Sequence, residues 1–193
     1  PRPFCWIEFG AGSGTLLLAA IAHLSRNESP LLSALEIEAI EANPFRRAEL
    51  AAAIAPTGVP TRMQENDSPP AAAGIVVANE FLDALPTHIV VGRRAEPDGF
   101  LERRVAMDTD GRSFTWVEGA PDAAIAEALR ARVAAHVAAA APLAEGQLAE
   151  FSLAADAWVA ALPFRFARGV IAIIDYGREA PALRDPATRM AGT

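Results

Sequence analysis

The first part of the chain alternates short apolar runs with segments of helical periodicity. Strands are predicted for four runs, at 4–9, in the latter half of 31–41, at 59–64 (weakly) and at 74–81. Helices are predicted over 14–25 and 43–56, the second with Asn43 as its N-cap and Pro44 at its first position. This alternation predicts an α/β fold, with a parallel sheet covered by helices.

The pattern changes after residue 86, where an excursion interrupts the alternation. An antiparallel group of strands is predicted at 87–94, 99–108 and 113–119, with turns at "EPDG" and "DTDG". Helices are predicted over 121–140 and 149–166, the second broken near Pro163. A last core strand is predicted at 169–177. This pattern divides the chain into three predicted parts. They are a first half of the core domain at 1–86, an inserted region at 87–168, and a return to the core sheet at 169–193.

Composition excludes several classes of function. The net charge is −7 and the 17 basic residues form no stripe, so nucleic acid is not an expected partner. All 17 are arginine, which excludes a Walker-type phosphate loop and every Schiff-base mechanism. Cys5 stands alone and predicts a buried apolar side chain, and three scattered histidines predict no metal site.

The length of the apolar runs and the chain ends set further expectations. No run approaches the length of a membrane span. Pro1 is not a natural start and no stop signal closes the sequence, so we expect a fragment of a longer protein. The oligomeric state is not predicted. We expect a cytoplasmic location in a bacterium, or the mitochondrial matrix in a eukaryote.

The turn "EFGAGSGT" joins the first strand to the first helix. Its glycines permit a tight turn close to a ligand, at the amino end of a helix that presents free N–H groups. A dinucleotide fingerprint requires glycine where Thr15 stands; here the pattern is Glu8-x-Gly10-x-Gly12-x-Gly14. This spacing resembles that of class I methyltransferases. Near Glu8, the cationic S-adenosylmethionine is tolerated better than a pyrophosphate, although a plain tight turn stays possible.

Acidic residues follow three of the other predicted strands. Glu41 closes the second strand, where a carboxylate can accept hydrogen bonds from ribose hydroxyls, and Asp67 is a candidate contact to the adenine amino group. Glu80 and Asp83 stand at the end of the apolar run 74–81. Paired carboxylates can hold a planar guanidinium in two-point contact, although they can also simply cap a turn.

Four segments together carry a family resemblance: "EFGAGSGTL", "IEANP", "ANEFLDALP" and "IDYG". In this order and spacing they closely resemble the MidA-like family of S-adenosylmethionine-dependent methyltransferases of bacteria and mitochondria. Its mitochondrial member is an assembly factor for respiratory complex I that dimethylates an arginine of a subunit. Two departures are visible: the family has Pro-Gly-Arg-Gly where this chain has residues 11–14, and the family's N-terminal region and last strands lie outside this chain.

The resemblance implies a Rossmann-like methyltransferase sheet with an inserted cover, a protein substrate that presents an arginine, and roles for individual residues. Glu80 and Asp83 would be catalytic, and Asp175 and Tyr176 would bind the substrate. The residues implied to bind S-adenosyl-L-methionine are Glu8, Gly10, Ala11, Gly12, Gly14, Thr15, Glu41 and Asn79.

Two other functions stay open at this point. A non-catalytic assembly factor could bind the same cofactor and act by docking its partner, in which case Glu80 and Asp83 would be dispensable. An NAD(P)-linked oxidoreductase would need the dinucleotide glycine spacing, which Thr15 breaks.

Overall fold

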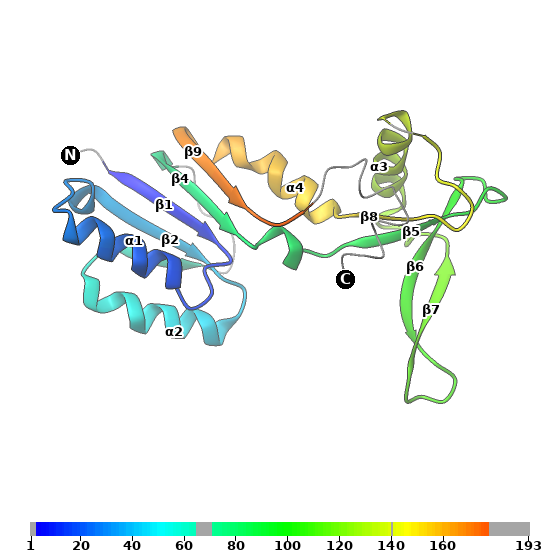
Figure 1. The fold of residues 1–193 in the computed structure, drawn as a ribbon, viewed down its shortest axis with the longest axis horizontal. Helices are drawn as coiled ribbons and strands as arrows, with labels where there is room; N and C mark the ends of the chain where they lie inside the picture. The colour runs from blue at the N-terminus through cyan, green and yellow to red at the C-terminus, as the bar shows by residue number, and fades with distance from the viewer. Residues whose placement is uncertain (1–2, 65–70, 140, 178–193) are drawn as a thin grey trace. The chain divides into compact units, whose positions relative to one another are not determined.

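The chain is divided between two units that are described separately below. The computed structural model describes residues 3–64, 71–139 and 141–177. Unit 1 comprises Pro1–Ala84 and Ala161–Thr193, and unit 2 comprises Leu85–Ala160. Unit 2 is therefore inserted into the sequence of unit 1. Most of their helices and strands are labelled in Figure 1.

Unit 1 is built on a parallel sheet of five strands in its described part. The strands are β1 (Phe4–Phe9), β2 (Leu35–Ile40), β3 (Thr61–Gln64), β4 (Ala71–Asn79) and β9 (Phe166–Ile174). Their order is β3-β2-β1-β4-β9, and every neighbouring pair is parallel. All carboxyl ends therefore meet at one edge. The direction of succession reverses between β1 and β4, where ligands of such sheets bind.

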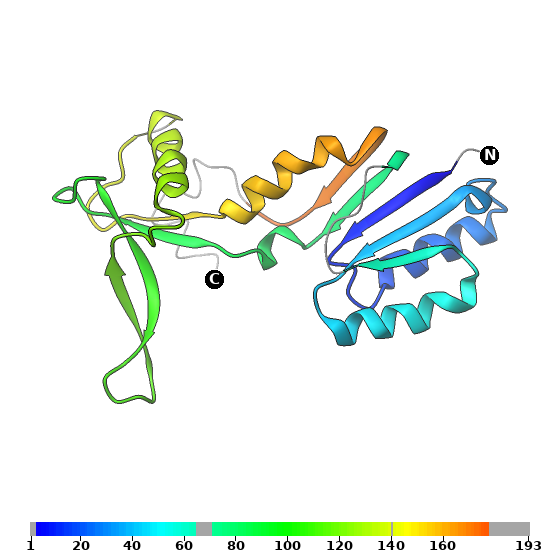
Figure 2. The same ribbon diagram turned by 180° about the vertical axis from the view of Figure 1, so that it is seen from behind.

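Two helices cover one face of this sheet (Figures 1 and 2). They are α1 (Thr15–Arg26) and α2 (Pro44–Ile54). Their buried side chains pack on the strand side chains of the same face; this core contains Leu17, Ile21, Leu35, Ile37, Ala39, Leu50 and Ile54. The predicted N-cap is confirmed, because the Asn43 side chain accepts hydrogen bonds from the amides of Phe45 and Arg46. Short 3₁₀ turns precede β2 (Leu32–Ala34) and follow α2 (Ala55–Thr57).

Unit 2 contains an antiparallel sheet with a helix on one face. The strands are β5 (His88–Gly92), β6 (Phe100–Met107), β7 (Phe114–Gly119) and β8 (Leu148–Phe151), in the order β7-β6-β5-β8. Helix α3 (Ala126–Ala139) packs on the side chains of Val90, Phe100 and Phe151, and together they form the core of this unit. Within this sheet His88 Nδ1 and Oε1 of the buried Glu102 are in hydrogen-bond contact at 2.9 Å. The expected α/β class, with separate parallel and antiparallel sheets, is confirmed.

One predicted helix begins too early. The helix expected over 149–166 starts only at Leu153, as α4 (Leu153–Ala161), because residues up to Phe151 pair with β5 as strand β8. Ser152 separates the two elements, and its hydroxyl accepts a hydrogen bond from the amide of Ala155. The break near Pro163 is confirmed by a 3₁₀ turn (Leu162–Phe164) before β9. The helix predicted over 121–140 also starts later than expected, at Ala126, as α3.

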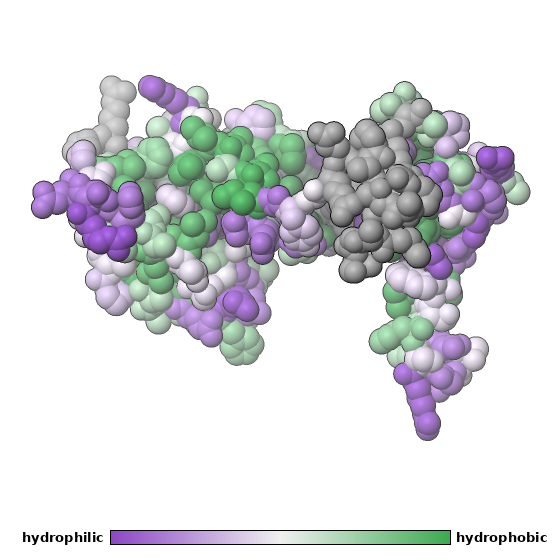
Figure 3. Space-filling view, in the orientation of Figure 1, coloured by the Kyte–Doolittle hydropathy of each residue, from purple (hydrophilic) through white to green (hydrophobic). Residues whose placement is uncertain are grey.

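Apolar side chains are exposed in two places, along β9 and on the β6–β7 hairpin. Figure 3 shows apolar surface over β9, where Val170, Ile171, Ile173 and Ile174 are exposed. The β6–β7 hairpin of unit 2 exposes a second group, formed by Val105, Met107, Phe114 and Trp116. Within the described ranges, no helix is both long and apolar enough to cross a bilayer.

Candidate active site

The glycine turn leaves β1 at Gly10 and enters α1 at Thr15. Its backbone is tied to β2 and to itself: the Gly10 amide donates to the Ile40 carbonyl at 2.8 Å, and the Gly14 amide donates to the Ala11 carbonyl at 2.9 Å. Gly14 is the N-cap of α1, and no side chain caps this helix end. The first amides of α1 are therefore available to a ligand group that accepts hydrogen bonds.

Close packing and backbone conformation both favour glycine in this turn. A Cβ on Gly14 would overlap the Leu50 side chain, and a Cβ on Gly10 would lie 3.1 Å from a ring carbon of Phe81. At Gly12 a Cβ would meet nothing closer than 3.9 Å, but φ is 57°, in the left-handed region. Gly10 and Gly14 also have positive φ, of 66° and 83°, so the turn conformation favours glycine at all three positions. At Gly10 and Gly14 close packing inside unit 1 leaves no room for a side chain as well.

Glu41 follows β2 and is bonded to the glycine turn. Its Oε2 accepts a hydrogen bond from the Gly12 amide at 2.9 Å, and its Oε1 accepts one from the Asn43 amide at 2.8 Å. The Arg47 guanidinium donates to the backbone carbonyl of Glu41. Each carboxylate oxygen can accept a second hydrogen bond. The carboxylate is thus fixed in orientation and can still receive hydroxyl donors.

Glu8 is placed differently from the other acids of the site. It lies in β1, is 3% exposed, and its Oε2 accepts a hydrogen bond from Trp6 Nε1 at 3.0 Å. Burial raises the pKa of the Glu8 carboxyl from its ordinary value of 4.5 to about 7, and the Trp6 bond opposes that rise only in part. Near neutral pH the group therefore divides between its neutral and ionised forms.

The end of β4 forms the second half of the site. Asn79 and Glu80 are exposed, and the chain then turns into a 3₁₀ segment, η3 (Leu82–Ala84). Glu80 has φ 47°, a left-handed conformation that a residue with a side chain rarely adopts. Its amide donates to the Ile174 carbonyl of β9 at 2.8 Å. Such a conformation persists only where neighbouring structure enforces it, and it is most common at functional sites.

Asp175 and Tyr176 follow β9 directly and contact the end of β4. Asp175 Oδ2 accepts a hydrogen bond from the Leu82 amide at 3.1 Å, and its Oδ1 accepts one from the Tyr176 amide. The Tyr176 hydroxyl donates to Asp83 Oδ2 at 2.8 Å, which raises the pKa of that hydroxyl. Two segments 93 residues apart in sequence thus meet at one edge, and Tyr176 orients the carboxylate of Asp83.

Some acidic oxygens at this edge have no partner within the described part of the chain. The Glu80 carboxylate and Asp83 Oδ1 form no hydrogen bond there. Asp67, the candidate adenine contact, lies outside the described residues.

One residue of this edge was not predicted from the sequence. It is Phe81, whose ring lies 5.5 Å from the Phe9 ring and against Gly10. Its position directly after Glu80 in "NEF" was the available signal.

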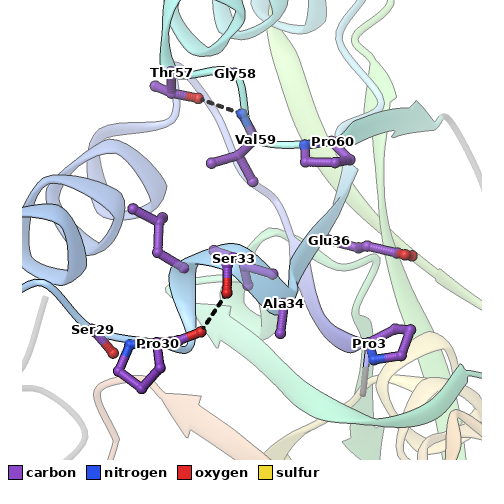
Figure 4. Close-up of a pocket in the computed structure, with 12 residues that line it drawn as sticks. Pro3, Ser29, Pro30, Ser33, Ala34, Glu36, Thr57, Gly58, Val59 and Pro60 are labelled. Carbon is purple, nitrogen blue, oxygen red and sulfur yellow. Dashed lines mark hydrogen bonds between the residues drawn. The ribbon is translucent and has the colours of Figure 1, made fainter. Parts of the chain in front are cut away.

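A pocket of about 580 Å³ lies at the opposite end of the sheet, near the amino ends of β1 and β2 (Figure 4). Its hydroxyls are already engaged locally: Ser33 donates to the Pro30 carbonyl, and Thr57 accepts from the Val59 amide. A ligand site normally gathers several available polar groups in one hollow. The carboxyl edge offers more available polar groups than the pocket, because the Glu41 carboxylate and the α1 amides can each take a further partner.

Comparison with known proteins identifies the family. The sequence profile of a family described as "Putative S-adenosyl-L-methionine-dependent methyltransferase" matches residues 1–193. The chain belongs to this family. Two solved structures from Burkholderia thailandensis are similar to this chain. One, an uncharacterized protein, has a TM-score of 0.72 and 27% identity over 94% of this chain and 46% of its own. A search of curated proteins found no match.

The second Burkholderia thailandensis structure was solved with S-adenosyl-homocysteine bound. It has a TM-score of 0.68 and 29% identity, covering 91% of this chain and 42% of its own. The methyltransferase-family chain thus spans less than half the length of either structure. Its own residues suit the family's cofactor, because the helix end at Gly14 has no side-chain cap and the Glu41 carboxylate can accept further hydrogen bonds.

Proposed function

We propose that the protein transfers a methyl group from S-adenosyl-L-methionine to an arginine side chain of a protein partner. The observation that carries this proposal is the pair of exposed carboxylates, Glu80 and Asp83, at the carboxyl edge that also holds the glycine turn. Paired carboxylates bind a guanidinium through charge-assisted hydrogen bonds. The MidA-like resemblance supports the same acceptor and extends it to a subunit of a respiratory complex.

The cofactor site of this proposal is formed by the glycine turn and the neighbouring strand ends. The Gly10–Gly14 turn, with Ala11 and the α1 amide of Thr15, would hold the methionine portion, whose carboxylate suits a helix amino end. Glu41 would accept both ribose hydroxyls, and Asn79 would line the floor. Glu8, when ionised, would act as a buried counter-charge to the cationic portion.

S-adenosyl-L-methionine, when bound, supplies a methyl group on a positively charged sulfur. The protein's own task is then to hold the acceptor nitrogen in position, since orientation supplies much of the rate in such a displacement. Glu80 and Asp83 would hold the guanidinium through its N–H groups, and one of the two carboxylates would accept the proton that the methylated nitrogen releases. Tyr176 and Asp175 would act by fixing Asp83 and the η3 segment. The acceptor-covering role of residues 87–168 stays a prediction.

The cofactor arm of the test is calorimetric titration of S-adenosyl-homocysteine. Glu41→Ala removes the predicted ribose acceptor, and we expect the affinity to fall about tenfold to a hundredfold, the usual loss when polar partners are left unpaired. Glu36→Ala is the matched control, because Glu36 is an exposed residue of the same strand. NADH is titrated in parallel; tight binding of NADH in place of S-adenosyl-homocysteine would overturn the proposal.

The acceptor arm uses an extract of cells that lack the protein. The full-length protein and methyl-tritiated S-adenosyl-L-methionine are added, and labelled protein is hydrolysed and analysed for methylarginine. Glu80→Gln and Asp83→Asn should abolish labelling while S-adenosyl-homocysteine still binds. Label on another nucleophile would overturn the arginine acceptor. Full biological function in a Glu80→Gln/Asp83→Asn double variant would instead favour a non-catalytic assembly factor.

A further inference from the structure

Phe81 lies between the two halves of the candidate site. Its ring is 5.5 Å from the ring of Phe9, the last residue of β1, with the ring planes tilted by 49°. A Cβ on Gly10 would lie only 3.1 Å from Phe81 Cδ2, so the ring rests against the backbone of the glycine turn. Phe81 also follows Glu80 directly and precedes η3, which contains Asp83. One side chain therefore contacts the turn while its backbone forms part of the acidic strand end.

The backbone on both sides of Phe81 is fixed to β9. On one side the Glu80 amide donates to the Ile174 carbonyl at 2.8 Å, and on the other the Leu82 amide donates to Asp175 Oδ2 at 3.1 Å. The Phe81 carbonyl accepts a hydrogen bond from the Ala84 amide at 3.3 Å. The backbone around Phe81 is thus held at three points, and its ring lies against Gly10.

The left-handed backbone of Glu80 needs such support. A residue with a side chain is unfavourable at φ 47° and stays there only where its surroundings over-determine the conformation. The bonds to β9 constrain Glu80 from one side. The contact of the Phe81 ring with Phe9 and Gly10 constrains it from the side of the glycine turn.

We propose that Phe81 is a positioning residue, whose contact with the glycine turn fixes the backbone of Glu80 and η3 and so aims the two carboxylates toward the position of the cofactor. This inference rests on the proposed function, because it takes the glycine turn as the cofactor site and the acidic strand end as the acceptor site. Phe81 itself needs to touch neither ligand. Removing its ring should loosen the strand end without removing a cofactor contact.

The first test measures hydrogen exchange in the ligand-free full-length protein. In Phe81→Ala, we expect the amides of Leu82 and Ala84 to exchange about tenfold faster or more, while the β4 amides of Val76–Ala78 keep their rates. Phe45→Ala is the matched control, because Phe45 is 80% exposed on α2. Unchanged exchange at Leu82 and Ala84 would overturn the proposal. If Phe81→Ala does not fold, Phe81→Leu replaces it, with a severalfold increase expected and no increase overturning the proposal.

The second test separates positioning from cofactor binding. For Phe81→Ala we expect S-adenosyl-homocysteine affinity within about threefold of the wild type and methyl-transfer kcat about tenfold lower or more, since small misplacements are costly in positioned reactions. Phe81→Leu should restore most of kcat. Equal proportional losses of affinity and kcat would overturn the proposal. The exchange test needs no cofactor or acceptor, so faster exchange without methylarginine formation by the wild type would refute only the proposed function.

Discussion

The carboxyl group of Glu8 is buried, and within the described residues its hydrogen-bond donor is Trp6. Between its ordinary pKa of 4.5 and about 7, the folded protein keeps a proton that the unfolded chain has lost. The free energy of unfolding should therefore fall as the pH rises through this interval. By linkage the contribution is on the order of 3 kcal/mol, present below pH 4.5 and lost above pH 7.

Glu8→Gln should flatten this dependence, because glutamine stays neutral throughout. Thermal midpoints measured at pH 5, 6, 7 and 8 should fall with pH in the wild type and change much less in the variant. Glu36→Gln makes the same change at an exposed position of β2 and should follow the wild type. A Glu8→Gln profile parallel to that of the wild type would show that Glu8 does not titrate in this interval.

The location of a single residue was predictable from the sequence where the residue stands at the end of a predicted strand. Glu41, Glu80 and Asp83 were expected at the carboxyl ends of strands, and they lie there. The bonds they make were not predictable, because the Tyr176–Asp83 contact depends on the pairing of β4 with β9 across 93 residues. The contact of Phe81 with Gly10 was not predictable for the same reason. The sequence shows an apolar side chain, but the contact forms only when β1 and β4 are neighbours in the sheet.

Among the elements, α2 shows how a local signal fixes a boundary. The Asn43 side chain accepts hydrogen bonds from the amides of Phe45, at 2.9 Å, and Arg46, at 3.3 Å, and Pro44 occupies the first helical position. These features involve only residues one to three positions apart. The start of α2 was therefore predictable from the sequence alone.

Removing this cap should cost stability in a measurable way. Asn43→Ala leaves two helix amides without their acceptor, and we expect the free energy of unfolding in urea to fall by about 1 kcal/mol. Asn43→Asp keeps an acceptor oxygen at the same place and should lose little. Equal losses for the two substitutions would mean that the side chain does not cap α2.

Strand β8 marks the limit of local reasoning. Its four residues, Leu148–Phe151, adjoin a long Ala-rich segment of helical composition, which is why the helix was expected to begin at 149. Pairing with β5 and the burial of Phe151 against α3 override that preference. Ser152 was a readable sign of the true helix start, since serine is a favoured N-cap.

At the scale of the whole molecule, each unit has its own core. Leu50 is fully buried in the core of unit 1, and Leu129 is fully buried in the core of unit 2. Leu→Ala substitutions at such positions usually cost about 2–5 kcal/mol. The two substitutions are a matched pair, because the chemical change is the same and only the unit differs.

Hydrogen exchange should localise the two losses. Leu129→Ala is expected to speed exchange of the amides of β5 and β6 more than those of β1 and β2, and Leu50→Ala should do the reverse. Native conditions are required, so that local opening dominates over global unfolding. If each substitution accelerated the amides of both units equally, the two units would unfold as one cooperative body.

The insertion of unit 2 between β4 and β9 has a kinetic consequence. These paired strands are separated by residues 80–165, so their contact closes a long loop of chain. Each doubling of loop length costs about 0.6 kcal/mol in closure entropy, and non-local pairing slows folding. Early collapse of Leu85–Ala160 would shorten the flexible part of this loop. On this ground we expect β9 to join the sheet last, bringing Asp175 and Tyr176 to the site with it.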